Sequence, residues 1–230
     1  GFKDVNYLKM FDKRNLVNLT NGLKTDVGTL ASHLSVIKSI KKYNLRKIIS
    51  FHSRVKNAKS FSLDFPKIYT WVPANQKKPI NLWSKHVNGS QKSHEREDII
   101  SEFDDRKLSD FSILTNARCL SEGIDVPSVN GIVYVEPKQS YIDIIQSIGR
   151  AIRKNKENKK SKIIIPINIS DTNNPDLEFE NSSYKKIWNV LKALKSHDDN
   201  LNDEIDYIRS NLGTKKSSIK LKKIIIDLPD

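Results

Sequence analysis

The sequence predicts an α/β domain, in which helices flank a parallel sheet, followed by a C-terminal helical extension. Short apolar runs of strand length alternate with longer stretches whose apolar residues recur at helical spacing. The clearest unit is the apolar run 132–135, a helical stretch at 140–153 and a second apolar run at 163–165. Strand, helix and strand in succession are typical of a parallel sheet, because parallel strands need a crossover connection.

The first elements are a linker, a helix and a strand. We interpret residues 1–25 as a linker from an upstream domain and residues 26–43 as an amphipathic helix. Residues 47–52 form the first predicted strand. The inward face of the helix is predicted to carry Leu30, Leu34, Ile37 and either Ile40 or Tyr43.

A long insertion, predicted to be helical, separates this strand from the next one at 82–87. Phe61, Phe65 and Trp71 are its expected core anchors, and Pro66 is expected to break the helix. Aromatic residues can also stack on bases, but this spacing suits one buried helical face. We therefore expect a core role for all three.

The second half of the chain continues the sheet to about residue 170. An apolar strand at 111–114 runs into a segment in which Asn116 suits a helix N-cap and Gly123 a C-cap. Such a strand leaves polar groups at the carboxyl edge of the sheet, where open α/β folds bind ligands. The domain is thus expected to span 26–170, and 171–230 a helical extension with a frayed tail after Gly213.

The chain is basic. Its 230 residues carry a formal net charge of +13 and a pI near 9.6. Such a field attracts polyanions, which favours nucleic acid as a partner over the alternative that lysine reflects an AT-rich coding genome.

Several other classes of protein are disfavoured by composition. The single cysteine, Cys119, precludes an internal disulfide and fits a cytoplasmic location. No apolar stretch reaches 18 residues, so no membrane association is expected. The five histidines form no ligand-spaced cluster with cysteine, so no metal site is predicted beyond magnesium arriving with ATP.

The helix at 140–153 carries the most informative side chains. At 100° per residue, Gln146, Arg150 and Arg153 share one face, opposite an isoleucine-rich face that includes Ile144. Forked guanidinium donors on one face suit a phosphate group. The competing interpretation is a pair of ordinary surface arginines.

Four segments in order resemble the motifs of superfamily 2 helicases. Residues 48–54 resemble motif IV, 87–103 the Gly-x6-Arg segment, 113–127 motif V and 146–153 motif VI. The amino-acid sequences of these motifs are most similar to those of large bacterial and phage helicases related to restriction-enzyme motor subunits. The resemblance implies that this chain is the second, C-terminal RecA-like domain of such a helicase.

The resemblance also implies roles for particular residues. Arg153 and Arg150 match the motif VI arginine fingers that reach the γ-phosphate of ATP from across an interdomain cleft, and Gln146 matches their polar partner. Gly123 and Asp125, with Glu122 beside them, match nucleotide-binding positions of motif V. The positions that match the nucleic-acid track are Thr115, Asn116, Ser53, Arg54, Asn88 and Gly89.

Half of an ATP site is therefore expected in this chain. No Walker A loop is present, and the acidic string at 203–206 lacks the buried strand that a Walker B motif requires. ATP and magnesium would be bound mainly by an upstream RecA-like domain, and these 230 residues alone are expected to be inactive.

Two functions from different classes remain open. The chain is interpreted as the second motor domain of an ATP-dependent helicase or translocase, and the alternative is a non-catalytic module that binds nucleic acid or acts as a scaffold. The shared face of Gln146, Arg150 and Arg153 favours the motor. Ser93 stands where many RNA helicases carry glutamine, so DNA is favoured over RNA.

Overall fold

The computed structural model describes residues 8–11, 16–105, 111–117, 129–136, 144, 162–166, 182–189, 218–220 and 225–227. The chain divides into two compact units. One unit comprises residues 6–166 and contains the main sheet, and the other comprises residues 1–5 and 167–230.

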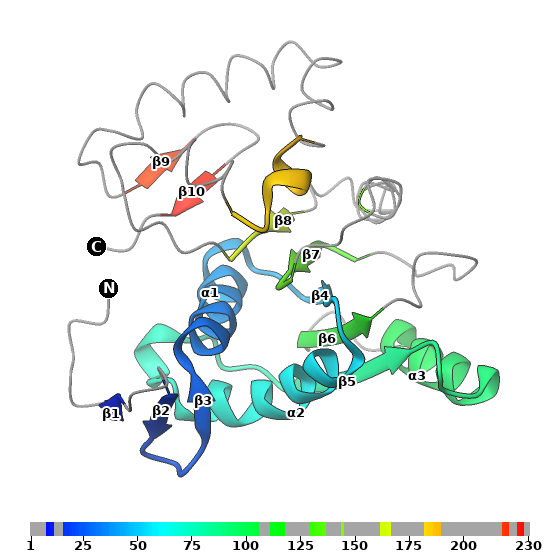
Figure 1. Ribbon diagram of the computed structural model, residues 1–230, viewed down its shortest axis with the longest axis horizontal. Coiled ribbons are helices and arrows are strands. Elements are labelled where there is room, and N and C mark those ends of the chain that lie inside the picture. Colours follow the sequence, from blue (N-terminus) through cyan, green and yellow to red (C-terminus); the bar gives the residue numbers. More distant parts are fainter. Residues whose placement is uncertain are drawn as a thin grey trace. The chain divides into compact units, whose positions relative to one another are not determined.

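A five-stranded parallel sheet with the order β5-β6-β4-β7-β8 forms the centre of the larger unit (Figure 1). Every residue of the three inner strands is buried, including polar residues such as Lys47, Ser112 and Asn116, as is usual in the interior of a parallel sheet. The strands are β4 (Lys47–Phe51), β5 (Leu82–Asn88), β6 (Phe111–Ala117), β7 (Gly131–Tyr134) and β8 (Lys162–Ile164). The predicted α/β fold is confirmed.

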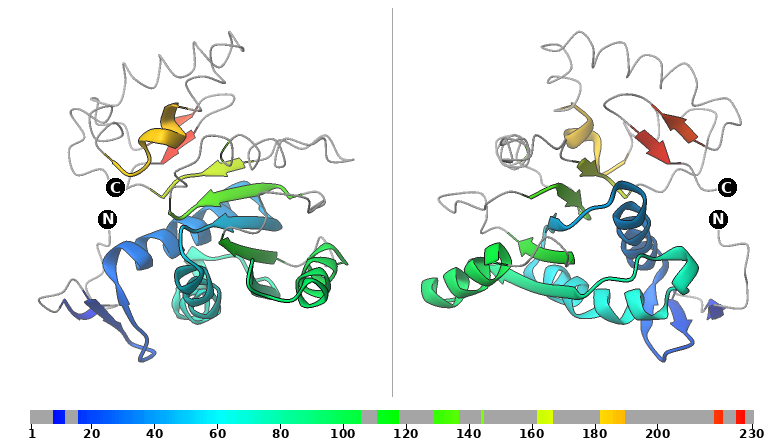
Figure 2. Two further views of the ribbon diagram at one scale, coloured as in Figure 1. Left: turned by 45° about the vertical axis from the view of Figure 1, so that its right-hand side comes forward. Right: turned by 180° about the vertical axis from the view of Figure 1, so that it is seen from behind.

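Helices cover both faces of this sheet (Figure 2). On β5, Ser84 bonds to Ser62 of helix α2 (Val55–Trp71), whereas the Trp83 ring packs against the ring of Phe103 of helix α3 (Ser93–Asp105). Successive strand residues point to opposite faces, so α2 and α3 lie on opposite sides. Helix α1 (Val27–Tyr43) shares the core with α2, and a short 3-10 turn at Ala74–Gln76 follows α2.

Helix α1 matches its predicted bounds closely. Asp26 caps its first turn by accepting a 2.8 Å hydrogen bond from the Thr29 N–H, and Asn44 ends it in the left-handed conformation at φ 52°. The four predicted inward positions Leu30, Leu34, Ile37 and Ile40 are all buried.

The expected linker contains folded structure. Strands β1 (Leu8–Phe11), β2 (Leu16–Leu19) and β3 (Lys24–Asp26) form an antiparallel sheet, and Val17 and Leu19 are buried in the main core. Burial alternates along β2, with Val17 and Leu19 buried and Leu16 and Asn18 only partly buried, because successive strand residues point to opposite faces. Residues 16–26 therefore belong to the domain.

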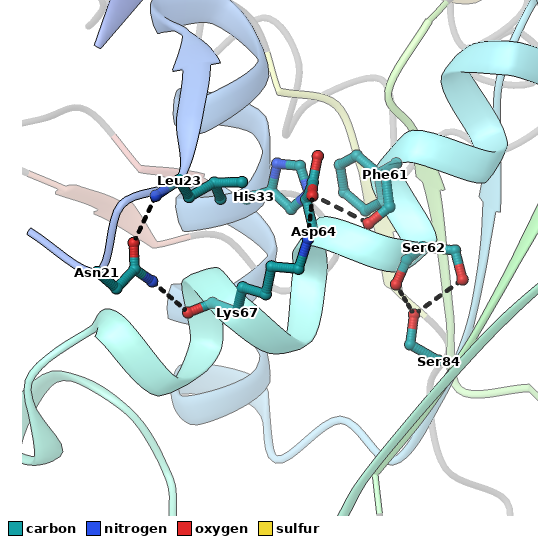
Figure 3. Close-up of polar contacts among 8 residues, drawn as sticks. All are labelled: Asn21, Leu23, His33, Phe61, Ser62, Asp64, Lys67 and Ser84. Atoms are coloured by element: carbon teal, nitrogen blue, oxygen red, sulfur yellow. Dashed lines mark hydrogen bonds and ion pairs between the residues drawn. The ribbon is translucent and has the colours of Figure 1, made fainter. Parts of the chain in front are cut away.

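The turn between β2 and β3 contacts α2 through Asn21 (Figure 3). The Asn21 side chain accepts a 3.1 Å hydrogen bond from the Leu23 N–H and donates one of 3.2 Å to the Lys67 carbonyl. Gly22 adopts φ 85°, a conformation that glycine reaches at little cost. The turn thus attaches the N-terminal hairpin to the C-terminal half of α2.

Pro66 was expected to break helix α2, but the helix continues through it, because β5 replaces the hydrogen bond that proline removes. Pro66 lacks the N–H that would bond to the Ser62 carbonyl one turn earlier. The Ser84 hydroxyl donates to that carbonyl at 2.8 Å instead (Figure 3). Phe61 and Phe65 are buried as predicted, whereas Trp71 is only partly buried and donates to the Thr20 hydroxyl.

The second unit begins after Pro166. Residues 185–189, within the segment expected to be a helical extension, are helical, and Ile187 and Trp188 are buried. Strands β9 (Ser218–Lys220) and β10 (Ile225–Asp227) form an antiparallel pair where a frayed tail was expected. The β-branched isoleucines of this segment favour strand over disorder. No helix in the described residues has the length and apolarity to cross a membrane.

Candidate nucleotide and nucleic-acid site

The ends of four parallel strands place the predicted track residues at one edge of the sheet. Phe51 of β4 lies beside Asn116 of β6 and Tyr134 of β7, and Asn88 of β5 lies beside Ala117 of β6. Ser53 and Arg54 follow β4 directly, and Gly89 follows β5. All six predicted nucleic-acid residues therefore lie at or next to the carboxyl edge, where parallel sheets bind ligands.

Two of the six are open to solvent. Arg54 is exposed, and its guanidinium forms no hydrogen bond or ion pair within the described part of the chain. Gly89 is exposed, and a Cβ added there would meet nothing within 4 Å. A side chain would therefore find room at position 89 in this structure, and the predicted role of Gly89 in the nucleic-acid track stays a prediction.

Ser53 is held by a carboxylate from the neighbouring strand end. Its N–H donates to Oε2 of Glu136 at 2.9 Å, and its hydroxyl donates to the same oxygen. The Asn57 amide donates to Oε1 of Glu136. Burial raises the pKa of the Glu136 carboxyl, but these hydrogen bonds outweigh it, so the pKa lies below its ordinary value.

Asn88 shapes the loop after β5 and is itself buried. Its side-chain oxygen accepts hydrogen bonds from the N–H and hydroxyl of Ser90, and its N–H donates to Gln91 at 2.8 Å. Arg96 donates to the Gln91 carbonyl at 3.3 Å. The Gly-x6-Arg segment is thus an ordered loop with Gly89 exposed on it.

Thr115 and Asn116 are fully buried. The Thr115 hydroxyl donates to the Ala58 carbonyl at 2.9 Å and so joins β6 to α2. The strand β6 lies between β5 and β4, which explains this burial. The side chains of both residues are thus buried in this structure, and the predicted role of these positions in holding nucleic acid stays a prediction.

Two buried histidines lie under this edge on either side of Phe61. The His33 ring stacks on Phe61 at 3.8 Å between centroids, and the His52 ring lies 5.0 Å from it. Burial lowers the pKa of both, to about 4 for His52. The ring of His52 is therefore neutral near pH 7, with Nε2 3.1 Å from the Ser50 hydroxyl.

Strand β7 anchors the segment that leads to the predicted arginines. The fully buried Tyr134 stacks on Phe51 and donates from its hydroxyl to the Ile144 carbonyl at 3.3 Å. Ile144 is itself fully buried, as predicted for the isoleucine-rich face. The chain is thus fixed to β7 two residues before Gln146.

The remaining predicted site residues lie outside the described part of the chain. They are Gln146, Arg150 and Arg153, and also Glu122, Gly123 and Asp125. Their predicted roles stay predictions. Among the residues that the structure describes, no group of three or more histidine, cysteine and acidic side chains could hold a metal ion.

Sequence reasoning missed Glu136 and its partner Asn57. Glu136 directly follows the predicted strand 132–135 and precedes Pro137. An acidic residue at the end of a buried parallel strand is a usable signal, because that position lies at the ligand-binding edge. Asn57 has no such signal, since only the fold brings it to Glu136.

The five-stranded parallel sheet and the helices on both of its faces define an α/β domain of the RecA-like class. The helicase conserved C-terminal domain family matches residues 31–155, more than half of the chain. The chain belongs to this family, whose members form the C-terminal domain of superfamily 2 helicases.

Individual relatives support the same assignment. A probable helicase of African swine fever virus is 36% identical over 61 residues, 26% of this chain and 7% of the relative. A killer plasmid pGKL-2 helicase of Kluyveromyces lactis, itself uncharacterized, is 26% identical over 166 residues, 69% of this chain and 28% of the relative. The chain therefore spans only a small part of these relatives.

A solved structure supports the fold. The ATP-dependent Type ISP restriction-modification enzyme LlaBIII, bound to DNA, superposes with a TM-score of 0.66 at 23% identity. The match covers 82% of this chain and 13% of that chain.

Proposed function

We propose that this chain is the second motor domain of an ATP-dependent helicase or translocase and that it acts on nucleic acid together with an upstream RecA-like ATPase domain. The observation that carries the proposal is the family match across residues 31–155, which includes all four motif segments. ATP with magnesium would be bound mainly by the partner domain. The 230 residues alone would then complete no ATP site.

The nucleotide-facing part of the proposal rests on the segment after β7. Arg153 and Arg150 would act as arginine fingers on the γ-phosphate, with Gln146 beside the attacking water. Gly123, Asp125 and Glu122 would lie against the nucleotide. The bond between Tyr134 and Ile144 supports this arrangement, because it fixes the start of the arginine segment to the sheet.

The nucleic-acid part rests on the strand ends. Arg54 would contact a phosphate through its exposed guanidinium, and the backbone at Gly89 would approach the strand closely. Ser53 and Asn88 would shape these two loops, since their side chains already bond within the chain. DNA is the proposed substrate, in keeping with the DNA-bound enzyme that shares the fold.

Substitution of Arg153 in the full-length protein tests the proposal. Arg153→Ala should lower ATP turnover at saturating nucleic acid by about 10³-fold or more, because a finger stabilises transition-state charge. Arg153→Lys should not restore full activity, since an ammonium lacks the guanidinium fork. Nucleic-acid binding should stay near wild type in both variants.

The alternative, a non-catalytic scaffold with ordinary surface arginines, predicts a different result. Arg153→Ala would then change stability by less than about 1 kcal/mol and leave turnover unaltered. Wild-type turnover in the alanine variant would remove Arg153 from the mechanism.

A further inference from the structure

The loop after β4 is fixed by a residue from a different strand. Helix α2 begins at Val55 after the N-cap residue Arg54, whose side chain makes no capping bond. The free N–H groups of a helix start favour an anionic partner. The Glu136 carboxylate lies beside this helix start, where it accepts hydrogen bonds from Ser53, which precedes the N-cap, and from the side-chain amide of Asn57 in the first turn.

Both carboxylate oxygens of Glu136 are engaged. Oε2 accepts from the Ser53 N–H and hydroxyl, and Oε1 accepts from the Asn57 amide. The Glu136 N–H also donates to the Phe51 carbonyl at 3.3 Å, so the two strand ends are joined through backbone and side chain alike. These contacts fix the turn that presents the exposed Arg54.

The end of β7 also contacts Ile144. Tyr134, two residues before Glu136, donates to the Ile144 carbonyl. Tyr134 and Glu136 therefore connect the end of β7 to Ile144 and to the Arg54 turn, respectively.

We propose that Glu136 is a positioning residue that couples the nucleic-acid turn at Ser53 and Arg54 to the end of strand β7 and so holds Arg54 for contact with a phosphate. The inference rests on the proposed motor function. Glu136 itself touches neither ATP nor nucleic acid.

The test is nucleic-acid-stimulated ATPase of the full-length protein at a series of single-stranded DNA concentrations. Glu136→Ala frees the turn, so the DNA concentration for half-maximal stimulation should rise about tenfold, with kcat at saturating DNA within about twofold of wild type. Glu136→Gln keeps one carbonyl acceptor for the Ser53 N–H and should give an intermediate value.

Glu102→Ala is the matched control. Glu102 is also a partly exposed carboxylate with two side-chain partners, Trp83 and Lys85, but it lies on α3. It should lower the melting temperature without moving the half-stimulation concentration. An equal half-stimulation concentration in Glu136→Ala and wild type would overturn the inference.

The outcome for the proposed function is separate. If wild-type protein shows no DNA-stimulated ATPase, the motor assignment fails. If wild type is stimulated and Glu136→Ala responds identically, only the coupling role of Glu136 fails. A parallel change in half-stimulation concentration in the Glu102→Ala variant would also overturn it, because that change would reflect loss of stability.

Discussion

At the scale of single residues, burial decides what the polar groups near the site can do. Thr115 and His52 are both fully buried, and each uses a side-chain atom within the chain. Arg54, two residues after His52, is exposed. The sequence names the residue at each position, but the availability of its side chain to a ligand depends on the neighbours that the fold supplies.

His52 should make stability depend on pH. Its folded pKa of about 4 lies below the ordinary 6.5, so the unfolded chain takes up the proton first as pH falls. The stabilisation is present above pH 6.5 and is lost between about 6.5 and 4, by about 3.5 kcal/mol at most at 1.4 kcal/mol per pKa unit. Burial of His33 acts in the same direction.

Urea unfolding of wild type and His52→Gln between pH 7 and 4.5 measures this dependence. The variant places an amide where Nε2 lies and should lose part of the slope. His94→Gln, a change at an exposed histidine on α3, should keep the wild-type slope. Identical slopes in wild type and His52→Gln would contradict the assignment.

At the scale of elements, α2 shows how a neighbouring strand can accept a proline inside a helix. The Ser84 hydroxyl occupies the role of the missing N–H at the Ser62 carbonyl. The Ser62 and Ser84 hydroxyls also lie 3.2 Å apart, so α2 and β5 are joined twice at this point. Helix continuity therefore depends on a tertiary contact.

Ser84→Ala should destabilise the protein by about 1–2 kcal/mol, because the Ser62 carbonyl loses its donor. In a Pro66→Ala background the same change should cost less, since residue 66 then supplies an N–H to that carbonyl. Denaturant unfolding of wild type, the two single variants and the double variant gives the coupling energy directly. Ser60→Ala, on the exposed side of α2, is the control. A coupling energy near zero would show that the Ser84 bond does not replace the helix bond.

At the scale of the whole molecule, the net charge of +13 favours nucleic acid, while the strand ends localise the contact. A general field and a specific phosphate contact differ in their salt dependence. Each phosphate contact releases condensed counterions, so the logarithm of affinity falls linearly with the logarithm of salt concentration. If a diffuse positive field alone caused binding, substitutions that remove the same charge at different positions would change this slope equally.

Binding of the 230-residue chain to single-stranded DNA should therefore weaken steeply as salt increases. Arg54→Ala should reduce the magnitude of the salt slope by about one, the change expected when a phosphate contact is lost. Lys24→Ala, which removes an exposed cation from β3 and the same net charge, should leave the slope near wild type. Equal slopes for the two variants would place the contact elsewhere.

The sequence alone determined the fold class and the order along the chain of the main strands and helices. Short apolar runs, such as 48–49, 113–114 and 132–135, mark the buried parallel strands, and α1 has one apolar face, so the local sequence pattern was sufficient for both. The family resemblance followed from short motifs in order, and the match over 31–155 bears it out. These are properties of adjacent residues, which a linear pattern records.

Only the tertiary structure decided which polar groups meet. Glu136 reaches Ser53 and Asn57 across 83 and 79 positions, and Ser84 reaches Ser62 across 22. Only the structure assigns β2 to the domain, because it shows Val17 and Leu19 buried in the main core. Such contacts depend on strand order and register, which bring distant residues together and leave no periodic trace in the chain.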